Sequence, residues 1–390
     1  LREAAETITK IADAEGLDAH AESIRLRIEG LMTWPDIRND LKLVEGYHSP
    51  QLSVEVRLNT NESPLPPPNQ WVSEIKEAVT TIEWNRYPDR NASELASRLA
   101  QSHGVQPNNV VCANGSNEII QAILLAYGGN NRSAIMFEPT YAMHTQIAKI
   151  TGTEVISRNR DELLLCGRNG LEMLTTAKPN IVFLCSPNNP TGLIEPKETI
   201  ISALEYCSKN SSLLVVDEAY GEFSDWSAIE LVDNGAPMVV TRTFSKAHGF
   251  AAGRLGYAVG ASRLIDGMKE VLLPYHLDSF KQIAAITALK YRDEMRQRVE
   301  YLKSQREKVS DELKNLPLQV WDSAANFILF KPLETVDMSG NDLWKALVND
   351  SVLVRDCSNW PNLTDCLRAT IGTEQENNSF IDSLKAIQGY

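Results

Sequence analysis

The sequence predicts an α/β fold: a large domain with a mostly parallel, seven-stranded sheet between helices, plus a smaller α+β domain. Between residues 110 and 260, short β-branched apolar segments alternate with segments of helical length. That alternation is typical of a doubly wound sheet whose two faces are both covered by helices. The chain has 390 residues, of which 43% are apolar. This exceeds the length of one ordinary domain, so a second unit is expected.

Seven segments of the large domain are predicted strands because each is short and apolar on both faces, as buried strands are. They are Val110–Ala113, Ser133–Phe137, Thr153–Ser157, Ile181–Leu184, Leu213–Val216, Met238–Thr241 and Leu255–Val259. Helices are predicted before and between them, over Trp71–Trp84, Ala92–His103, Ser116–Tyr127, Ala142–Ile150 and Pro196–Lys209.

The flanking segments predict the rest of the chain. Residues 35–69 are rich in proline, and Pro64–Pro68 can form neither a helix nor an inner strand because proline lacks the amide donor. We expect an arm there that lies over another surface, such as a partner subunit. Residues 279–315 predict one long, charged connecting helix. The smaller domain is predicted from the strands Asn326–Phe330, Val352–Arg355 and Leu367–Ile371 and from helices near 340–349 and 375–388.

The expected division of the chain is based on these elements. Residues 1–31 form an N-terminal extension, either helical or disordered, and residues 32–80 form the arm and part of the small domain. Residues 81–280 form the large domain, and residues 281–390 form the connecting helix and the small C-terminal domain.

Composition excludes several classes of function. Lys and Arg number 38 and Asp and Glu 51, so the net charge of −13 argues against a general affinity for nucleic acid or anionic membranes. No apolar run reaches the ~18 residues of a membrane span, and the first ten residues do not resemble a secretory signal. The six cysteines lack metal-ligand spacing, so we expect buried thiols of a cytoplasmic protein and no metal site.

Polar residues follow the predicted strands at the edge where a doubly wound sheet binds its ligands. After the first strand, Asn114–Glu118 opens a helix whose N-terminus favours an anion, although an ordinary N-cap explains the same residues. After the fourth strand, Ser186–Gly192 (SPNNPTG) predicts a rigid turn that holds an Asn side chain at the edge. Asp217 directly follows the fifth strand and will be partly desolvated, and Tyr220 lies three residues further on.

A lysine and an arginine complete this set. Lys246 lies in a small, apolar loop after the sixth strand, where desolvation and nearby cations lower the pKa of an amine and favour its neutral form. Arg254 lies just before the next strand, where it can bind a phosphate with two hydrogen bonds. These groups match pyridoxal 5'-phosphate (PLP), whose aldehyde binds a Lys and whose ring nitrogen pairs with a carboxylate.

Over about 35–390 the chain resembles the fold-type I PLP enzymes of the aminotransferase class. The resemblance rests on SPNNPTG, on Val216–Tyr220 (VDEAY) and on Thr243–Lys246 with Arg254 (TFSK…R). Within class II it is similar to the histidinol-phosphate aminotransferases through Arg57–Pro64, Tyr87–Asp89, Asn114–Glu118, Glu138–Tyr141, Leu273–Tyr275, Ala325–Phe327, Leu353–Asp356 and Cys366–Gly372. The resemblance implies transamination between L-histidinol phosphate and 2-oxoglutarate in histidine biosynthesis, performed by a cytoplasmic homodimer.

The resemblance also implies a role for each site residue. Lys246 binds the PLP aldehyde and moves a proton, and Asp217 pairs with the ring nitrogen. Arg368 binds the α-carboxylate of glutamate and 2-oxoglutarate. It further implies that Tyr220 and Asn189 contact the phenolate oxygen and that Tyr141 stacks on the ring. The implied contacts of the PLP phosphate are Ser116, Asn117, Thr243, Ser245 and Arg254. Those of the substrate phosphate are Tyr47, Arg355 and Arg368.

Two positions depart from the family pattern. Many relatives carry a Tyr where Leu65 stands, and Leu cannot donate a hydrogen bond to the neighbouring subunit's PLP phosphate. His248 stands where Phe is common, and it either packs only or tunes the charge near Lys246.

The N-terminal extension has its own resemblance. Ile11–Arg27 is similar to the C-terminal tail of histidinol dehydrogenase, in which the residues matching Glu15 and His20 serve the substrate and a zinc ion. The rest of that enzyme is absent, so no metal site is expected. A fused remnant, a start placed upstream of Met32 and a plain amphipathic extension all remain open.

The same residues leave alternative functions. An aromatic amino acid aminotransferase and a threonine-phosphate decarboxylase share the fold and the cofactor. A PLP-binding regulatory module would need a DNA-binding domain, and residues 1–31 are too short and too acidic to form one.

Overall fold

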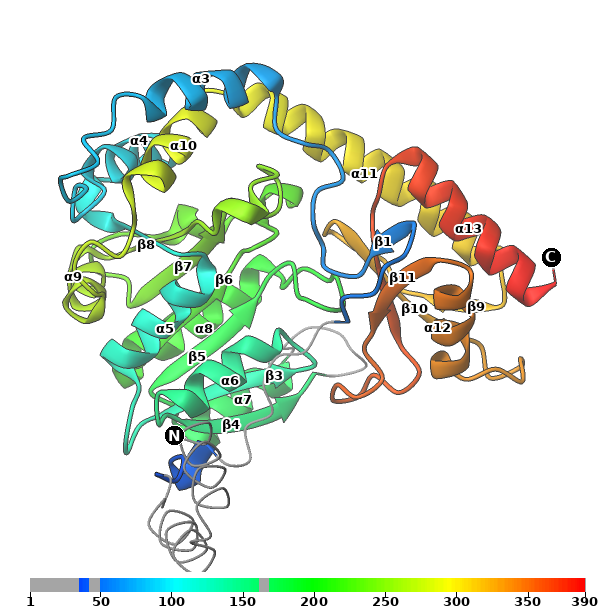
Figure 1. Cartoon of the computed structure of the whole chain (residues 1–390). Helices are drawn as coiled ribbons and strands as arrows, with labels where there is room; N and C mark the ends of the chain where they lie inside the picture. The colour runs from blue at the N-terminus through cyan, green and yellow to red at the C-terminus, as the bar shows by residue number, and fades with distance from the viewer. Residues whose placement is uncertain (1–34, 42–49, 161–167, 390) are drawn as a thin grey trace, which may run out of the picture. The chain divides into compact units, whose positions relative to one another are not determined.

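The computed structural model describes residues 35–41, 50–160 and 168–389 (Figure 1). Residues 35–41 belong to a unit of their own and contain one short helix, η1 (Asn39–Leu41). The other described residues belong to a second unit, which extends from Glu45 to the C-terminus and contains both sheets. The expectations for residues 1–31, Tyr47 and Cys166 lie outside the described residues.

The large sheet has seven strands, as the sequence predicts. They are β2 (Val110–Ala113), β3 (Ser133–Glu138), β4 (Glu154–Asn159), β5 (Ile181–Cys185), β6 (Leu213–Asp217), β7 (Met238–Thr243) and β8 (Gly256–Gly260). Their order is β2-β8-β7-β6-β5-β3-β4. β8 is antiparallel to β2 and β7, and the other neighbouring pairs are parallel, so the central strands end at a common edge.

Helices cover both faces of this sheet because alternate strand residues point in opposite directions. Ile181 and Phe183 pack with one set of helices, and Val182 and Leu184 pack with the other. The first set is α5 (Ser116–Tyr127), α6 (Ala142–Ile150) and α9 (Ser262–Val271), and the second is α3 (Asn69–Val79), α4 (Ser93–His103), α7 (Arg168–Ala177), α8 (Lys197–Asn210) and α10 (Ser279–Ala288).

The smaller sheet has five strands in the order β1-β11-β12-β10-β9. They are β1 (Val56–Leu58), β9 (Leu318–Val320), β10 (Phe327–Pro332), β11 (Val352–Asp356) and β12 (Leu367–Thr370). The helices α11 (Arg292–Lys314), α12 (Gly340–Asn349) and α13 (Glu374–Gln388) share its apolar core. In Figure 1, α11 runs from the α3 and α10 side to this sheet, with α13 alongside it.

The prediction of one long helix over 279–315 is wrong, because the chain breaks between α10 and α11. The amides of Lys290 and Tyr291 donate to the carbonyl oxygens of Thr287 and Ala288, which forms a tight turn. Tyr291 is buried in the large-domain core, and its hydroxyl donates to Glu74 on α3. Tertiary packing of this one ring therefore overrides a continuous helical pattern.

Among the described residues, two strands and two α-helices were not predicted, nor were the short 3-10 helices. β1 lies inside the proline-rich segment, where it pairs with β11 in parallel. β1 and β9 each have three residues, which is too few to show the period of two of a strand. α7 and α9 lie in segments with many polar residues, for which no helix was predicted. The domain boundaries stay a prediction, although Trp71 and Ala284 belong to the large-domain core.

Two further expectations concern the cysteines and membrane-spanning helices. Cys112, Cys185, Cys207, Cys357 and Cys366 are all free and buried, as expected. Within the described ranges, no helix combines the length and apolar character that crossing a bilayer requires.

Candidate active site

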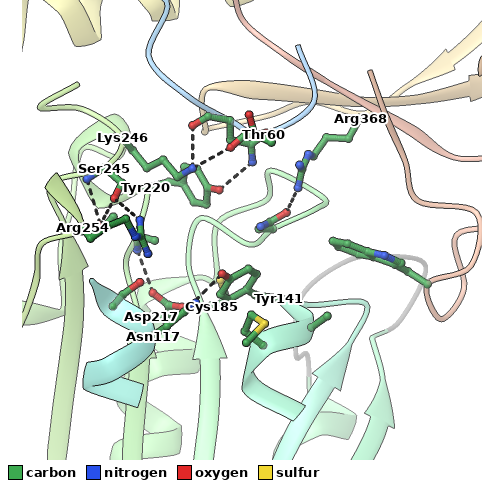
Figure 2. Close-up of a pocket in the computed structure, with 18 residues that line it drawn as sticks. Thr60, Asn117, Tyr141, Cys185, Asp217, Tyr220, Ser245, Lys246, Arg254 and Arg368 are labelled. Carbon is green, nitrogen blue, oxygen red and sulfur yellow. Dashed lines mark hydrogen bonds between the residues drawn. The ribbon is translucent and has the colours of Figure 1, made fainter. Parts of the chain in front are cut away.

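A cavity of about 240 Å³ lies where the strands of the large sheet end and the small domain approaches them (Figure 2). Every predicted site residue lines it except Tyr47, which lies outside the described residues, and Arg355. Its described lining is Thr60, Asn61, Ser116, Asn117, Tyr141, Ala142, Met143, Cys185, Asn189, Asp217, Ala219, Tyr220, Thr243, Ser245, Lys246, Arg254, Trp360 and Arg368.

Lys246 presents its amine to the cavity from the loop after β7. The amine donates hydrogen bonds to the carbonyl oxygens of Asn61, over 2.8 Å, and of Thr60, over 3.1 Å. Burial lowers the pKa of the Lys246 amine to about 7, and the nearby charges of Arg368 and Arg254 act in the same direction. A large share of the amine is therefore neutral and nucleophilic near pH 7.

Asp217 is the last residue of β6 and is 1% exposed. One carboxylate oxygen accepts hydrogen bonds from the Thr241 hydroxyl, over 2.9 Å, and from the Ala219 amide, over 3.1 Å. The other oxygen lies 2.8 Å from Nε2 of His144, which is fully buried on α6. These contacts fix the orientation of the carboxylate at the cavity.

Tyr220 and Asn189 lie on the side of the cavity nearest the small domain. The Tyr220 hydroxyl accepts a hydrogen bond from the Asn61 side chain over 2.8 Å, and burial raises the pKa of this phenol. The hydroxyl therefore keeps its proton at neutral pH and can donate it to a ligand. The side-chain oxygen of Asn189 accepts from the Arg368 guanidinium.

Several hydrogen-bond donors gather at the N-terminus of α5. Gly115 precedes this helix with φ +84°, and a Cβ there would lie 2.9 Å from Nη2 of Arg254. The backbone conformation therefore favours glycine, which also leaves room for the guanidinium of Arg254. Arg254 also donates to the Ser245 hydroxyl over 3.3 Å, and Ser245 in turn contacts the Thr243 hydroxyl.

Tyr141 and Asn117, both predicted site residues, line the same cavity. The Tyr141 hydroxyl donates to Asn117 over 3.2 Å, so the ring is tied to the first turn of α5. The rings of Tyr141 and His144 meet edge to face at a centroid distance of 5.5 Å. Figure 2 shows Tyr141 on the opposite side of the cavity from Lys246.

Arg355 and Arg368 are register partners on the antiparallel strands β11 and β12, so their side chains lie on one face of the small sheet. Both are buried, with exposures of 8% and 4%. Arg368 lines the cavity, where it also donates to the carbonyl oxygen of Asn59 over 3.0 Å. Two like charges buried side by side are unfavourable unless an anion compensates them.

Sequence reasoning missed several contributors to the site, among them Thr60, Asn61, His144 and Trp360. Thr60 and Asn61 belong to the RLNTNESP motif, which served only to mark the family. His144 follows Tyr141 on the first turn of α6, and a test for groups able to contact Asp217 could have found it. Trp360 lies in a loop that no local pattern marks.

The described residues fit PLP, the cofactor that the sequence predicts. An amine of lowered pKa, a fixed carboxylate, a protonated phenol and a group of hydrogen-bond donors surround one cavity, at the ends of β6, β7 and the start of α5. These are the contacts that the aldehyde, ring nitrogen, phenolate oxygen and phosphate of PLP require.

Comparison with known proteins identifies the family. The family "Aminotransferase class I and II" matches residues 53–384. Histidinol-phosphate aminotransferase of Corynebacterium diphtheriae is 39% identical over 362 residues, covering 90% of this chain and 96% of that protein. The enzyme of the same name from Mycolicibacterium vanbaalenii is 41% identical, covering 88% of this chain and 94% of that protein.

A solved structure shows the same fold. It is histidinol-phosphate aminotransferase from Sinorhizobium meliloti in complex with pyridoxal-5'-phosphate, with a TM-score of 0.81 at 19% identity, covering 92% of this chain and 99% of that chain. By its match over most of its length, the chain belongs to the class I and II aminotransferases and, among them, to the histidinol-phosphate aminotransferase family.

Proposed function

We propose that this protein transfers the amino group of L-histidinol phosphate to 2-oxoglutarate, giving imidazole acetol phosphate and glutamate, in histidine biosynthesis. Family membership supports the reaction class, and the buried pair Arg355 and Arg368 beside Lys246's cavity carries the choice of substrates. Both substrates bring an anion to this pair: a phosphate in one half-reaction and a carboxylate in the other. Charge-assisted hydrogen bonds to such anions are worth roughly 1.5–3 kcal/mol each.

PLP is the proposed cofactor, and when bound it supplies an electron sink for the electrons of the substrate Cα–H bond. Lys246 would hold its aldehyde, and Asp217 would keep its ring nitrogen protonated. The remaining contacts would come from Tyr220 and Asn189 at the phenolate oxygen, Tyr141 on the ring face, and Ser116, Asn117, Thr243, Ser245 and Arg254 at the phosphate.

Lys246 is also the proposed proton carrier. Its pKa of about 7 lets the free amine accept the Cα proton and return it at neighbouring pH values without a large energetic penalty. The carbonyl oxygens of Thr60 and Asn61 provide a resting position for the amine when it is not covalently bound. Arg368, held by Asn189 and Asn59, would bind the carboxylate of 2-oxoglutarate, and Arg355 would join it on the substrate phosphate, with Tyr47 as a further expected contact.

A homodimer is part of the proposal. Tyr87 and Leu273 are 80% and 75% exposed, and Tyr87 stacks on Tyr275 at 4.5 Å. Exposed apolar groups of this kind are typical of a surface that a partner covers. We also propose a cytoplasmic location, since the described cysteines are free thiols. Light scattering of the purified protein would test the dimer.

A coupled assay tests the reaction. The purified protein, loaded with PLP, is given 2-oxoglutarate with L-histidinol phosphate, L-histidinol or phenylalanine, and glutamate formation is followed. We expect the highest kcat/KM with L-histidinol phosphate. A higher kcat/KM with phenylalanine would instead identify an aromatic aminotransferase. Release of CO₂ from threonine phosphate, without glutamate formation, would identify the decarboxylase.

A further inference from the structure

The loop between β11 and β12 places an aromatic ring at the cavity. Trp360 lines the cavity together with Lys246 and Arg368, although it lies on the small domain. Its ring centroid is 5.9 Å from the guanidinium carbon of Arg355. Arg355 itself does not line the described cavity, whereas the indole that it contacts does.

The loop is well suited to hold this ring in one position. The amide of Cys357 donates to the carbonyl oxygen of Cys366 over 3.0 Å, which closes the loop at its base. Within it, the Trp360 amide donates to Cys357 over 2.9 Å, and the Leu363 amide donates to Trp360 over 3.2 Å. Beneath it, the buried side chains of Leu329, Cys357, Leu363 and Cys366 form a small apolar cluster against which Trp360 and Trp321 pack.

The two buried arginines use different supports. Arg368 donates to Asn189 and to Asn59, and its guanidinium lies 5.2 Å from the ring of the fully buried Phe327. Arg355 lies over the ring of Trp360. A guanidinium over an indole face gains electrostatic attraction, and the contact limits how far the side chain can turn.

We propose that Trp360 is a positioning and specificity residue, which orients Arg355 for the phosphate of the amino donor and shields that contact from water. This inference rests on the proposed function and extends it to a residue outside the predicted site. Arg368 keeps its own hydrogen bonds, so loss of the indole should weaken the phosphate-bearing substrate selectively. Binding of the carboxylate of 2-oxoglutarate should be largely unaffected.

The experiment measures KM and kcat separately for the two substrates in PLP-loaded protein. Trp360→Ala should raise the KM for L-histidinol phosphate about 10-fold, the size expected when a partly desolvated cation–π contact is lost. The KM for 2-oxoglutarate and the kcat should stay within about twofold of wild type, because their determinants are separate contacts. Trp360→Phe keeps an aromatic face and should restore most of the lost affinity.

Trp321→Ala is the matched control, because Trp321 packs on the same apolar cluster but does not line the described cavity. It should lower the thermal midpoint without changing the ratio of the two KM values. The inference is overturned if Trp360→Ala changes both KM values by the same factor, or neither. L-Histidinol, which lacks the phosphate, separates the two hypotheses. If the wild-type protein does not prefer L-histidinol phosphate to L-histidinol, the proposed function fails. If Trp360→Ala keeps the wild-type preference, only the inference about Trp360 fails.

Discussion

The Lys246 amine donates a hydrogen bond to the main-chain carbonyl oxygen of Asn61 over 2.8 Å, although 185 positions separate the two residues in the sequence. Asn61 follows β1 of the small sheet, and Lys246 follows β7 of the large sheet. The same Asn61 contacts the Tyr220 hydroxyl through its side chain. The short segment after β1 therefore orients two groups of the large domain at the cavity.

Replacing the amine tests its proposed covalent role. Lys246→Ala should abolish the visible absorbance of covalently held PLP and lower kcat by more than about 10³-fold, because both the nucleophile and the proton carrier are lost. Absorbance spectra and the coupled glutamate assay measure the two effects. Lys209→Ala, at an ion-pair side chain that is 75% exposed, serves as the control. Turnover close to wild type in Lys246→Ala would remove this residue from its role.

The lowered pKa of Lys246 predicts how PLP capture depends on pH. Below about pH 7 the amine is protonated and cannot attack an aldehyde, and above it the amine is neutral. The rate of PLP capture by the cofactor-free protein should therefore rise with pH and reach half its maximum near pH 7. Stopped-flow absorbance measures this rate.

A second variant checks the cause of that pH dependence. The charge of Glu62 favours the protonated amine, so Glu62→Gln should move the midpoint of PLP capture to lower pH. A rate that keeps rising beyond pH 9, as expected for an unperturbed lysine, would show that the amine is not desolvated.

Asp217 should matter for turnover more than for cofactor retention. Asp217→Ala removes the carboxylate that His144 and Thr241 hold in place. We expect kcat to fall by about 10²–10³-fold, as when one preorganised electrostatic contact is lost, while PLP stays covalently attached. Asp225→Ala, at a fully exposed side chain, is the control. Equal activity of the two variants would exclude Asp217 from the reaction.

The strands and the groups at their ends could be predicted because both depend on local chemistry. Short apolar runs identify buried strands, and α/β topology brings the residues after them to one edge. That argument places Asp217 and Lys246 together, and both line one cavity. Arg254 precedes β8 and reaches the same cavity because β8 is antiparallel to β7.

The remaining features depend on contacts between distant segments. The break before Tyr291 arises from its contact with Glu74, which the local helical pattern does not encode. The support of Lys246 by Asn61 joins the two domains, and the contact of Arg355 with Trp360 depends on how the loop after β11 folds back. No periodicity or spacing in the sequence signals such pairs.

His248 should make the protein sensitive to acid. Burial and the charges of Arg298 and Arg292 lower the pKa of His248 to about 3, compared with 6.5 for an ordinary histidine. Between these values the unfolded chain binds a proton that the folded protein does not, so stability is lost as the pH falls below 6.5.

His248 stacks on Phe244 at 4.4 Å, and phenylalanine can keep that contact. His248→Phe should therefore lose less stability than wild type between pH 7 and pH 5 in urea unfolding. His103, whose pKa burial lowers to about 4, remains in the variant, so a weaker acid sensitivity should persist. Parallel pH profiles of the two proteins would mean that His248 is already solvated and titrates equally in both states.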